Sequence, residues 1–114
     1  MVVEDDADVM FTITQRLNNS GFRCIPAPDG LSALVVGRQR NISAAVVDVN
    51  LPIGNGFEVA QALLESNAEV IMITASRDPV LRTRAAQLGC CGFVQKPFTG
   101  TFLVAQLKQA LHMD

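Results

Sequence analysis

The chain has 114 residues, 49% of them hydrophobic and 18% charged, a composition typical of one globular domain and unlike a disordered or fibrous chain. Nine Lys and Arg against eleven Asp and Glu give a formal net charge of -2 without a basic stripe, which argues against direct nucleic-acid binding. The apolar runs are too short to span a bilayer, and the start of the sequence lacks a secretory signal. The three cysteines fit neither a disulfide framework nor a zinc spacing. We therefore expect a soluble cytoplasmic protein without membrane contact.

Short, almost continuously apolar runs predict five buried strands. They lie at residues 2–3, 22–25, 44–49, 70–73 and 93–94. Each run is followed by apolar residues at helical spacing, which predicts one helix after each strand. The helical sets are Val9, Ile13 and Leu17; Leu31, Leu34 and Val35; Val59 and Leu63; Leu81, Ala85 and Leu88; and Leu103, Leu107 and Leu111.

Glycine and proline positions agree with these boundaries. Gly21 and Gly89 fall where helix C-caps are needed, and Asp78 followed by Pro79 is typical of a helix N-terminus. Strict alternation of strands and helices predicts an α/β fold, a doubly wound (βα)5 parallel sheet with helices on both faces, formed by residues 1–114 as one domain. In such sheets the functional crevice lies at the carboxyl ends of the strands.

Polar residues stand at these predicted strand ends. The acidic run 4–6 follows the first strand, Asp48 lies near the end of the third, Thr74 follows the fourth and Lys96 the fifth. Acidic residues in a loop are commonly just solvated, so the run 4–6 alone indicates little. Asp48 is different, because it ends an apolar run that favours burial, where an unpaired carboxylate is costly. We therefore expect a cationic partner for Asp48.

A divalent hard cation would relieve the repulsion between Asp48 and Asp5 on neighbouring strands, and Mg2+ commonly binds a few carboxylates together with phosphate. The Lys96 ammonium and the Thr74 hydroxyl suit phosphoryl oxygens, so the cluster predicts phosphoryl transfer with Asp48 as nucleophile. The motifs of a P-loop and of a dinucleotide fold are absent. A flavin-binding domain of this topology is disfavoured, because the run 4–6 would repel the flavin phosphate.

The strand-end motifs resemble those of one known family. They are Val-Val-Glu-Asp-Asp at 2–6, Val-Val-Asp-Val-Asn-Leu-Pro at 46–52 with Gly56 following, Ile-Met-Ile-Thr-Ala at 71–75, and Gly-Phe-Val-Gln-Lys-Pro-Phe at 92–98. Four such motifs in order, over nearly the whole chain, resemble the receiver domain of two-component response regulators. The resemblance implies a flavodoxin-like sheet with strand order 2-1-3-4-5.

The resemblance also implies a role for each matched acidic residue. Asp48 corresponds to the phosphoacceptor, while Glu4 and Asp5 correspond to the acidic pair that holds Mg2+ together with Asp48. Asn50 corresponds to the residue whose backbone carbonyl also binds the metal. The implied phosphodonor is a histidine kinase or a histidine phosphotransfer protein.

Further correspondences concern the phosphoryl oxygens and the conformational switch. Thr74 and Lys96 correspond to residues that contact the phosphoryl group, and the Lys96–Pro97 bond corresponds to the family's cis peptide. Thr74 and Phe93 occupy the switch positions, where Phe93 lacks the hydroxyl of a tyrosine. The first strand is shorter than is usual in the family, which suggests a truncated or different N-terminus.

Three function classes remain after these comparisons of motifs. The leading hypothesis is a receiver that catalyses only its own phosphorylation and dephosphorylation at Asp48 and so changes its binding to a partner. A phosphorylation-independent pseudo-receiver is the alternative, although such modules tend to lose residues that are present here. A metal-dependent phosphatase would need an acid/base group and a lid, for which 114 residues leave little room. The output could be a downstream protein of a stand-alone regulator, or another domain of a longer regulator or hybrid kinase.

Overall fold

Strands and helices alternate strictly along the chain in a computed structural model, which describes residues 1–113. The elements are β1 (Val2–Val3), α1 (Ala7–Asn19), β2 (Pro26–Ala27), α2 (Gly30–Gln39), β3 (Ala44–Asp48), α3 (Gly56–Glu65), β4 (Glu69–Thr74), α4 (Pro79–Leu88), β5 (Gly92–Gln95) and α5 (Gly100–Ala110).

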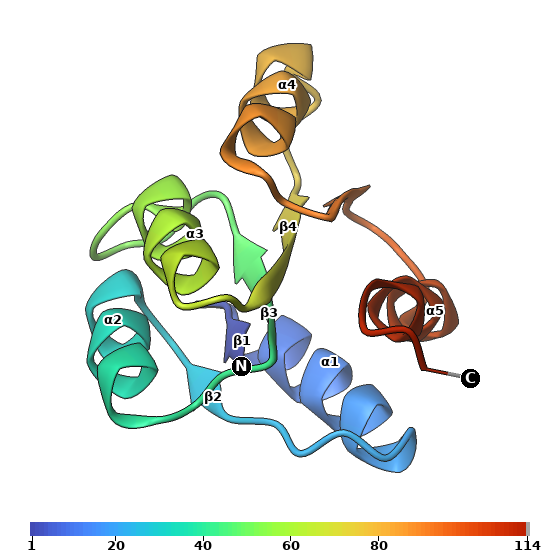
Figure 1. The fold of residues 1–114 in the computed structure, drawn as a ribbon. Coiled ribbons are helices and arrows are strands. Elements are labelled where there is room, and N and C mark those ends of the chain that lie inside the picture. Colours follow the sequence, from blue (N-terminus) through green and yellow to red (C-terminus); the bar gives the residue numbers. More distant parts are fainter. Residues whose placement is uncertain (114) are drawn as a thin grey trace.

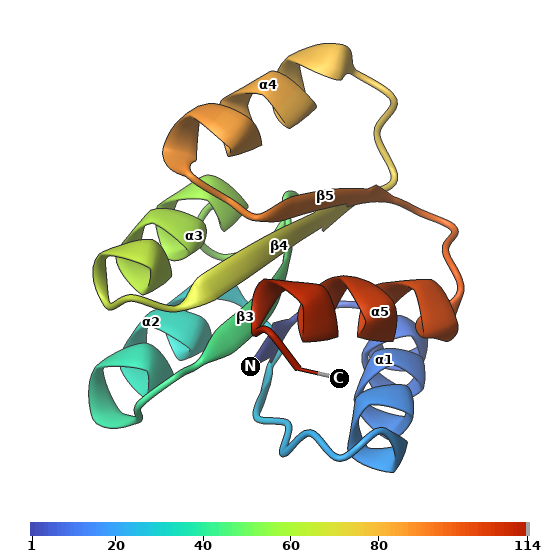
Figure 2. The same ribbon diagram turned by 45° about the vertical axis from the view of Figure 1, so that its right-hand side comes forward.

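The five strands form one parallel sheet in the order β2-β1-β3-β4-β5. Helices α1 and α5 cover one face of this sheet, and α2, α3 and α4 cover the other (Figures 1 and 2). The predicted doubly wound (βα)5 fold with order 2-1-3-4-5 is therefore confirmed. Because all strands are parallel, their carboxyl ends meet along one edge.

The centre of the sheet is buried on both faces, as parallel strands require. On β3, Val47 packs toward α2 and α3 while Val46 packs toward α1 and α5, and on β4 Met72 and Ile71 divide in the same way. All four residues are at most 1% exposed. This two-sided burial explains why both segments are almost continuously apolar, and it holds their carboxyl ends rigidly in place.

Local capping signals form as the sequence predicts. The Asp78 side chain accepts a hydrogen bond from the Val80 N–H at 3.0 Å, with Pro79 at the first helical position of α4. Helix α4 ends at Gly89, whose φ of 100° lies in the left-handed region that glycine adopts without strain. Gly21, just after α1, has φ 94°.

The predicted position of the second strand is wrong. Residues 22–25 form the connection after α1, and the strand is Pro26–Ala27. The N–H groups of Val2, in β1, and of Glu4, just after it, donate to the carbonyls of Ile25 and Ala27 at 2.9 and 3.1 Å. The run 22–25 is apolar because most of its side chains pack against the two cores. Pro26 is tolerated since β2 lies at the edge of the sheet.

The apolar face predicted for the second helix is only partly correct, since of its three residues Leu34 alone packs against the core. Leu31 and Val35 are 59% and 44% exposed, whereas Gly30 and Ala33 are buried. Helix α2 approaches its neighbours through small residues, because the Gly30 N–H donates to the Ile53 carbonyl at 2.7 Å. A side chain at position 30 would collide with that carbonyl. Close backbone contact thus decides which face of α2 is buried.

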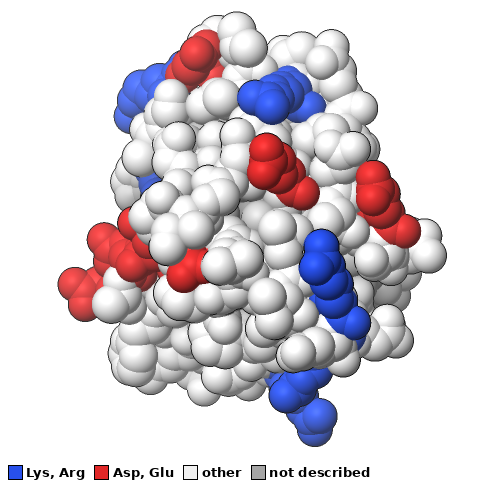
Figure 3. All heavy atoms as spheres, turned by 90° about the vertical axis from the view of Figure 1, so that its left-hand side faces the viewer, with Lys and Arg blue, Asp and Glu red and all other residues white. Residues whose placement is uncertain are grey.

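The molecular surface carries both signs of charge. On the face over α2 and α3, basic and acidic side chains are interspersed, and acidic side chains gather toward one edge (Figure 3). That face has no continuous basic stripe. Within residues 1–113, none of the helices has the length and apolar character needed to cross a membrane.

Gly56, the first residue of α3, allows that helix to pack directly beneath the end of β3. A Cβ atom there would lie 2.7 Å from the Val49 carbonyl oxygen and closer still to that of Asp48. We expect Gly56→Ala to destabilise the fold by about 1–3 kcal/mol, the usual cost of overpacking. Urea unfolding measures this. Gly37→Ala is the matched control, since its Cβ would meet only a Leu63 methyl at 3.4 Å and alanine favours a helix; equal losses in both variants would contradict the prediction.

Candidate phosphoryl-transfer site

Asp48 is the last residue of β3 and is only 5% exposed. Both of its carboxylate oxygens have partners. Oδ1 accepts a hydrogen bond from the Asn50 N–H at 2.9 Å, and Oδ2 lies 2.7 Å from the Lys96 ammonium. The expected cationic partner is therefore present within the chain itself, as the side chain of Lys96.

Glu4 follows β1 and is 1% exposed. Val3 pairs with Val47 across the β1–β3 ladder, so the next residues, Glu4 and Asp48, emerge side by side. The Glu4 Oε1 atom lies 2.6 Å from the Lys96 ammonium, and Oε2 accepts a hydrogen bond from the Asp6 N–H at 3.2 Å. A single lysine thus bridges the carboxylates at the ends of two neighbouring strands.

Burial and these ion pairs shift the pKa values of Glu4 and Lys96. Burial raises the pKa of Glu4 above 4.5, as does the nearby Asp48, while Lys96 opposes the shift. For Lys96, burial lowers the pKa, but hydrogen bonds and charge attraction from Asp48 and Glu4 outweigh it, so its pKa lies above 10.5. The lysine therefore remains an ammonium at neutral pH.

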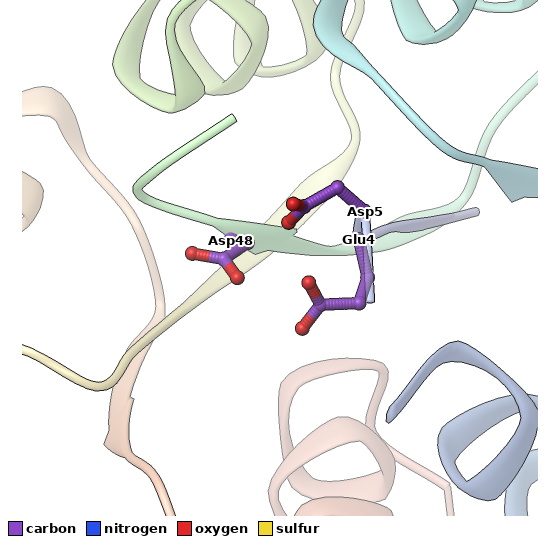
Figure 4. Close-up of side chains that lie close together, drawn as sticks. All are labelled: Glu4, Asp5 and Asp48. Carbon is purple, nitrogen blue, oxygen red and sulfur yellow. The ribbon is translucent and has the colours of Figure 1, made fainter. Parts of the chain in front are cut away.

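Three carboxylates converge on one space at this edge of the sheet. Glu4, Asp5 and Asp48 each present an oxygen, and these oxygens lie within 4.8 Å of one another (Figure 4). Asp5 is exposed, so the space opens to solvent. Clustered hard oxygen donors fit Mg2+ well. Asp6, the third acidic residue of the run, instead caps α1, accepting hydrogen bonds from the N–H groups of Asp8 and Val9.

The side chain at each of three strand ends also holds its own loop. Glu4, Asp48 and Thr74 all accept a hydrogen bond from the backbone N–H two residues further on. For Thr74, which is fully buried, the donor is Ser76 at 3.0 Å. In that bond the hydroxyl oxygen is the acceptor, so its own hydrogen stays free to donate to a phosphoryl oxygen. Such side-chain to backbone bonds order a loop locally.

The other predicted residues lie around this cluster. Asn50 is exposed and is tied to Asp48 through its N–H, and the Lys96–Pro97 peptide is cis. Phe93 is half-buried on β5, with the Arg82 guanidinium 5.0 Å above the centre of its ring. No sequence pattern predicts the Arg82 contact, because it joins α4 and β5, which meet only in the folded chain.

Gln95 is a second residue that sequence reasoning missed. Its side-chain amide donates to three backbone carbonyls beside the cluster. A single glutamine at the end of a strand has no distinguishing pattern in the sequence.

With this geometry in place, comparison with known proteins identifies the family. The family model of the response regulator receiver domain matches residues 1–108. The chain belongs to this family. Receiver domains are the signalling domains of two-component response regulators, and the motifs at residues 2–6, 46–52, 71–75 and 92–98 had indicated this membership.

Relatives of this receiver domain are regulatory proteins about twice its length. The regulatory protein VanRc of Enterococcus gallinarum is 33% identical over 112 residues, which cover 97% of this chain and 48% of VanRc. The transcriptional regulatory protein PrrA of Mycobacterium tuberculosis is 32% identical over 113 residues, with 97% and 48% covered. The chain thus spans about half the length of these curated relatives.

Solved structures share the fold. The BeF3-activated receiver domain of DrrB superposes with a TM-score of 0.87 at 26% identity, covering 97% of this chain and 94% of that one. A CheY-like receiver domain protein from Methanospirillum hungatei reaches a TM-score of 0.91 at 21% identity, with 97% and 90% covered. The second match bears on the fold alone.

Mg2+ should stabilise the protein by relieving repulsion among Glu4, Asp5 and Asp48. At 100 times the dissociation constant the gain would be about 2.7 kcal/mol. Thermal unfolding with and without Mg2+ measures it. Asp5→Asn should remove most of the gain with little effect on folding, since Asp5 is exposed. Glu65→Gln, an exposed change on α3, is the control and should keep the full gain. An equal response in all three proteins would contradict the metal assignment.

Proposed function

We propose that this chain is the phosphoacceptor receiver of a two-component phosphorelay, taking a phosphoryl group from a histidine kinase or histidine phosphotransfer protein onto Asp48. We propose further that residues 1–114 act as one receiver domain in the cytoplasm. One observation carries the proposal. The buried Asp48 carboxylate contacts the Lys96 ammonium and lies close to the carboxylates of Glu4 and Asp5, at the sheet edge where ligands of this fold bind.

The chemistry follows from these contacts. A carboxylate oxygen of Asp48 attacks the phosphorus of the donor phosphohistidine, the phosphorus–nitrogen bond breaks, and the imidazole leaves with that electron pair. Asp48 becomes an acyl phosphate. Mg2+, held by Glu4, Asp5, Asp48 and the Asn50 carbonyl, would supply charge neutralisation for the phosphoryl oxygens. Hydrogen bonding from the Asn50 N–H keeps the Asp48 carboxylate oriented in the meantime.

Lys96 and Thr74 are assigned to the transferred group. In the unphosphorylated protein the Lys96 ammonium already contacts Asp48, so it needs only a small movement to meet an oxygen of the new phosphoryl group. The free hydrogen of the buried Thr74 hydroxyl can donate to another. Preorganised donors of this kind stabilise charge that develops during transfer. The reaction is confined to the chain's own Asp48, so the protein is a signalling domain and not an enzyme with an external substrate.

We propose that phosphorylation changes the binding of a partner through a conformational change of Thr74 and Phe93. Movement of Thr74 toward the phosphoryl group would leave space beside it, and the half-buried Phe93 ring could turn inward to fill that space. Burial of a phenylalanine is worth about 1.5–3 kcal/mol, enough to bias two conformations. The affected surface would be the α4–β5–α5 face, which binds an output domain or a downstream protein.

The alternative of a phosphorylation-independent pseudo-receiver is not favoured. Such a module has no need for a buried acceptor, a carboxylate cluster and a bridging lysine in mutual contact. Here Asp48, Glu4 and Lys96 are all present and in contact.

Asp48→Asn should abolish phosphorylation, because the amide is not nucleophilic. With Mg2+ and a small phosphodonor, intact mass spectrometry should find one phosphoryl group on the native protein, removable by hydroxylamine as an acyl phosphate is, and none on the variant. Asp6→Asn is the matched control, since asparagine also caps a helix and Asp6 faces α1. A label that persists in Asp48→Asn would assign the acceptor to another residue.

Phe93→Ala should uncouple phosphorylation from the output face while leaving modification of Asp48 intact. In the native protein, beryllofluoride should shift amide resonances across α4, β5 and α5, and in the variant the shifts should stay near the strand-end loops. Phe11→Ala, which removes a 64% exposed ring on α1, serves as control. Shifts that spread equally in Phe93→Ala would show that the signal leaves by another path.

A further inference from the structure

Gln95 is hydrogen bonded to the backbone at the ends of β4 and β5, beside the phosphoryl-transfer site. Its amide nitrogen Nε2 donates to the carbonyl oxygens of Thr74 at 3.2 Å, Ala75 at 3.0 Å and Lys96 at 3.3 Å. Only two hydrogens serve these three acceptors, so at least one is shared. One side chain therefore links the ends of β4 and β5 just where Thr74 and Lys96 leave the sheet.

The position of Gln95 explains why such a link is needed. β5 is the edge strand, so only β4 supports it within the sheet. Gln95 pairs with Thr74 at the end of the ladder, and beyond that pair the single backbone bond from the Lys96 N–H to the Thr74 carbonyl, 2.8 Å, remains. From there the two segments diverge: the one after β4 leads to α4, and the one after β5 leads to Pro97. The amide of Gln95 extends the pairing by side-chain bonds.

Side-chain alternation places Gln95 on a defined face of the strand. Phe93 packs with the α2–α3–α4 core and Val94 with the α1–α5 core, so Gln95 lies on the same side as Phe93. This is the side from which the loop of Ala75 leads to α4. None of the hydrogen bonds of Gln95 is to Glu4, Asp5 or Asp48.

We propose that Gln95 is a positioning residue for phosphoryl transfer, fixing the backbones of Thr74 and Lys96 relative to each other. The inference rests on the proposed function, because it concerns the two residues assigned to the phosphoryl oxygens. The ammonium of Lys96 and the hydroxyl of Thr74 must reach one small group from two different strands. A shift of either backbone misplaces its donor, and misplacement of about 1 Å can cost up to about 100-fold in rate.

Gln95→Met tests the proposal, since methionine keeps the length of the side chain but cannot donate. We expect phosphorylation by a small phosphodonor to slow about tenfold, and beryllofluoride to bind about tenfold more weakly, the scale set by loss of hydrogen bonds. Mg2+ affinity should stay unchanged, because its carboxylates are not touched. Gln95→Lys restores a donor and should recover the rate to within about threefold.

The outcomes separate this proposal from the proposed function. A native protein that takes neither phosphoryl group nor beryllofluoride overturns the proposed function itself. If the native protein reacts and Gln95→Met reacts equally fast, the role of Gln95 alone is overturned. Equal losses of Mg2+ affinity and phosphorylation in Gln95→Met would also overturn it, since they would indicate general damage to the site.

A measurement on the native protein keeps the test independent of how the variants fold. The side-chain amide protons of Gln95 should exchange slowly with solvent and should shift when beryllofluoride is added with Mg2+. The side-chain amide of Gln15, exposed on α1, should do neither. Fast exchange of the Gln95 amide, with no shift, would overturn the proposal.

Discussion

The Lys96 ammonium between two buried carboxylates is the interaction on which the rest of this site depends. Glu4 and Asp48 emerge from adjacent strands into the protein interior, where an unpaired charge would be costly. Lys96 contacts both and is 20% exposed, so it satisfies the pair without being fully desolvated itself. Removing it would leave two uncompensated acidic groups, so Lys96 matters for stability as well as for the proposed phosphoryl transfer.

This bridge requires the particular strand order of the sheet. The order β1-β3-β4-β5 puts the carboxyl ends of β1 and β3 side by side, and Lys96 must reach across the end of β4 to contact them. The loops after β1, β3 and β4 are each ordered by a hydrogen bond that a backbone N–H donates to the side chain of the strand-end residue two positions before it. The site is thus held by rigid strands and short local bonds, not by long loops.

The α4 side of the molecule is held less firmly. Helix α4 contributes one fully buried residue, Ala85, whereas α3 contributes five. Leu81 and Leu88 of this helix are only partly buried against the core. Two of its guanidinium groups lie over aromatic rings, Arg82 on Phe93 and Arg84 on Phe57. Few buried apolar contacts imply a low free energy of local rearrangement. We therefore expect a structural change at Thr74 or Gln95 to displace α4 more easily than the other helices.

The order of elements, the parallel sheet and four of its strands followed from the sequence, because apolar periodicity and helix caps are local properties of the chain. Because the functional crevice of such sheets lies at the carboxyl ends of the strands, the sequence alone also predicted one shared edge for five residues: Glu4, Asp5, Asp48, Thr74 and Lys96. Local patterns could not distinguish the apolar connection 22–25 from a strand, since burial makes both apolar, nor the face of α2 that close backbone packing selects. The bridge from Lys96 to Glu4, 92 residues apart, and the three bonds of Gln95 were decided by the tertiary structure alone, because they join side chains and backbone that only the packed sheet brings within hydrogen-bonding distance.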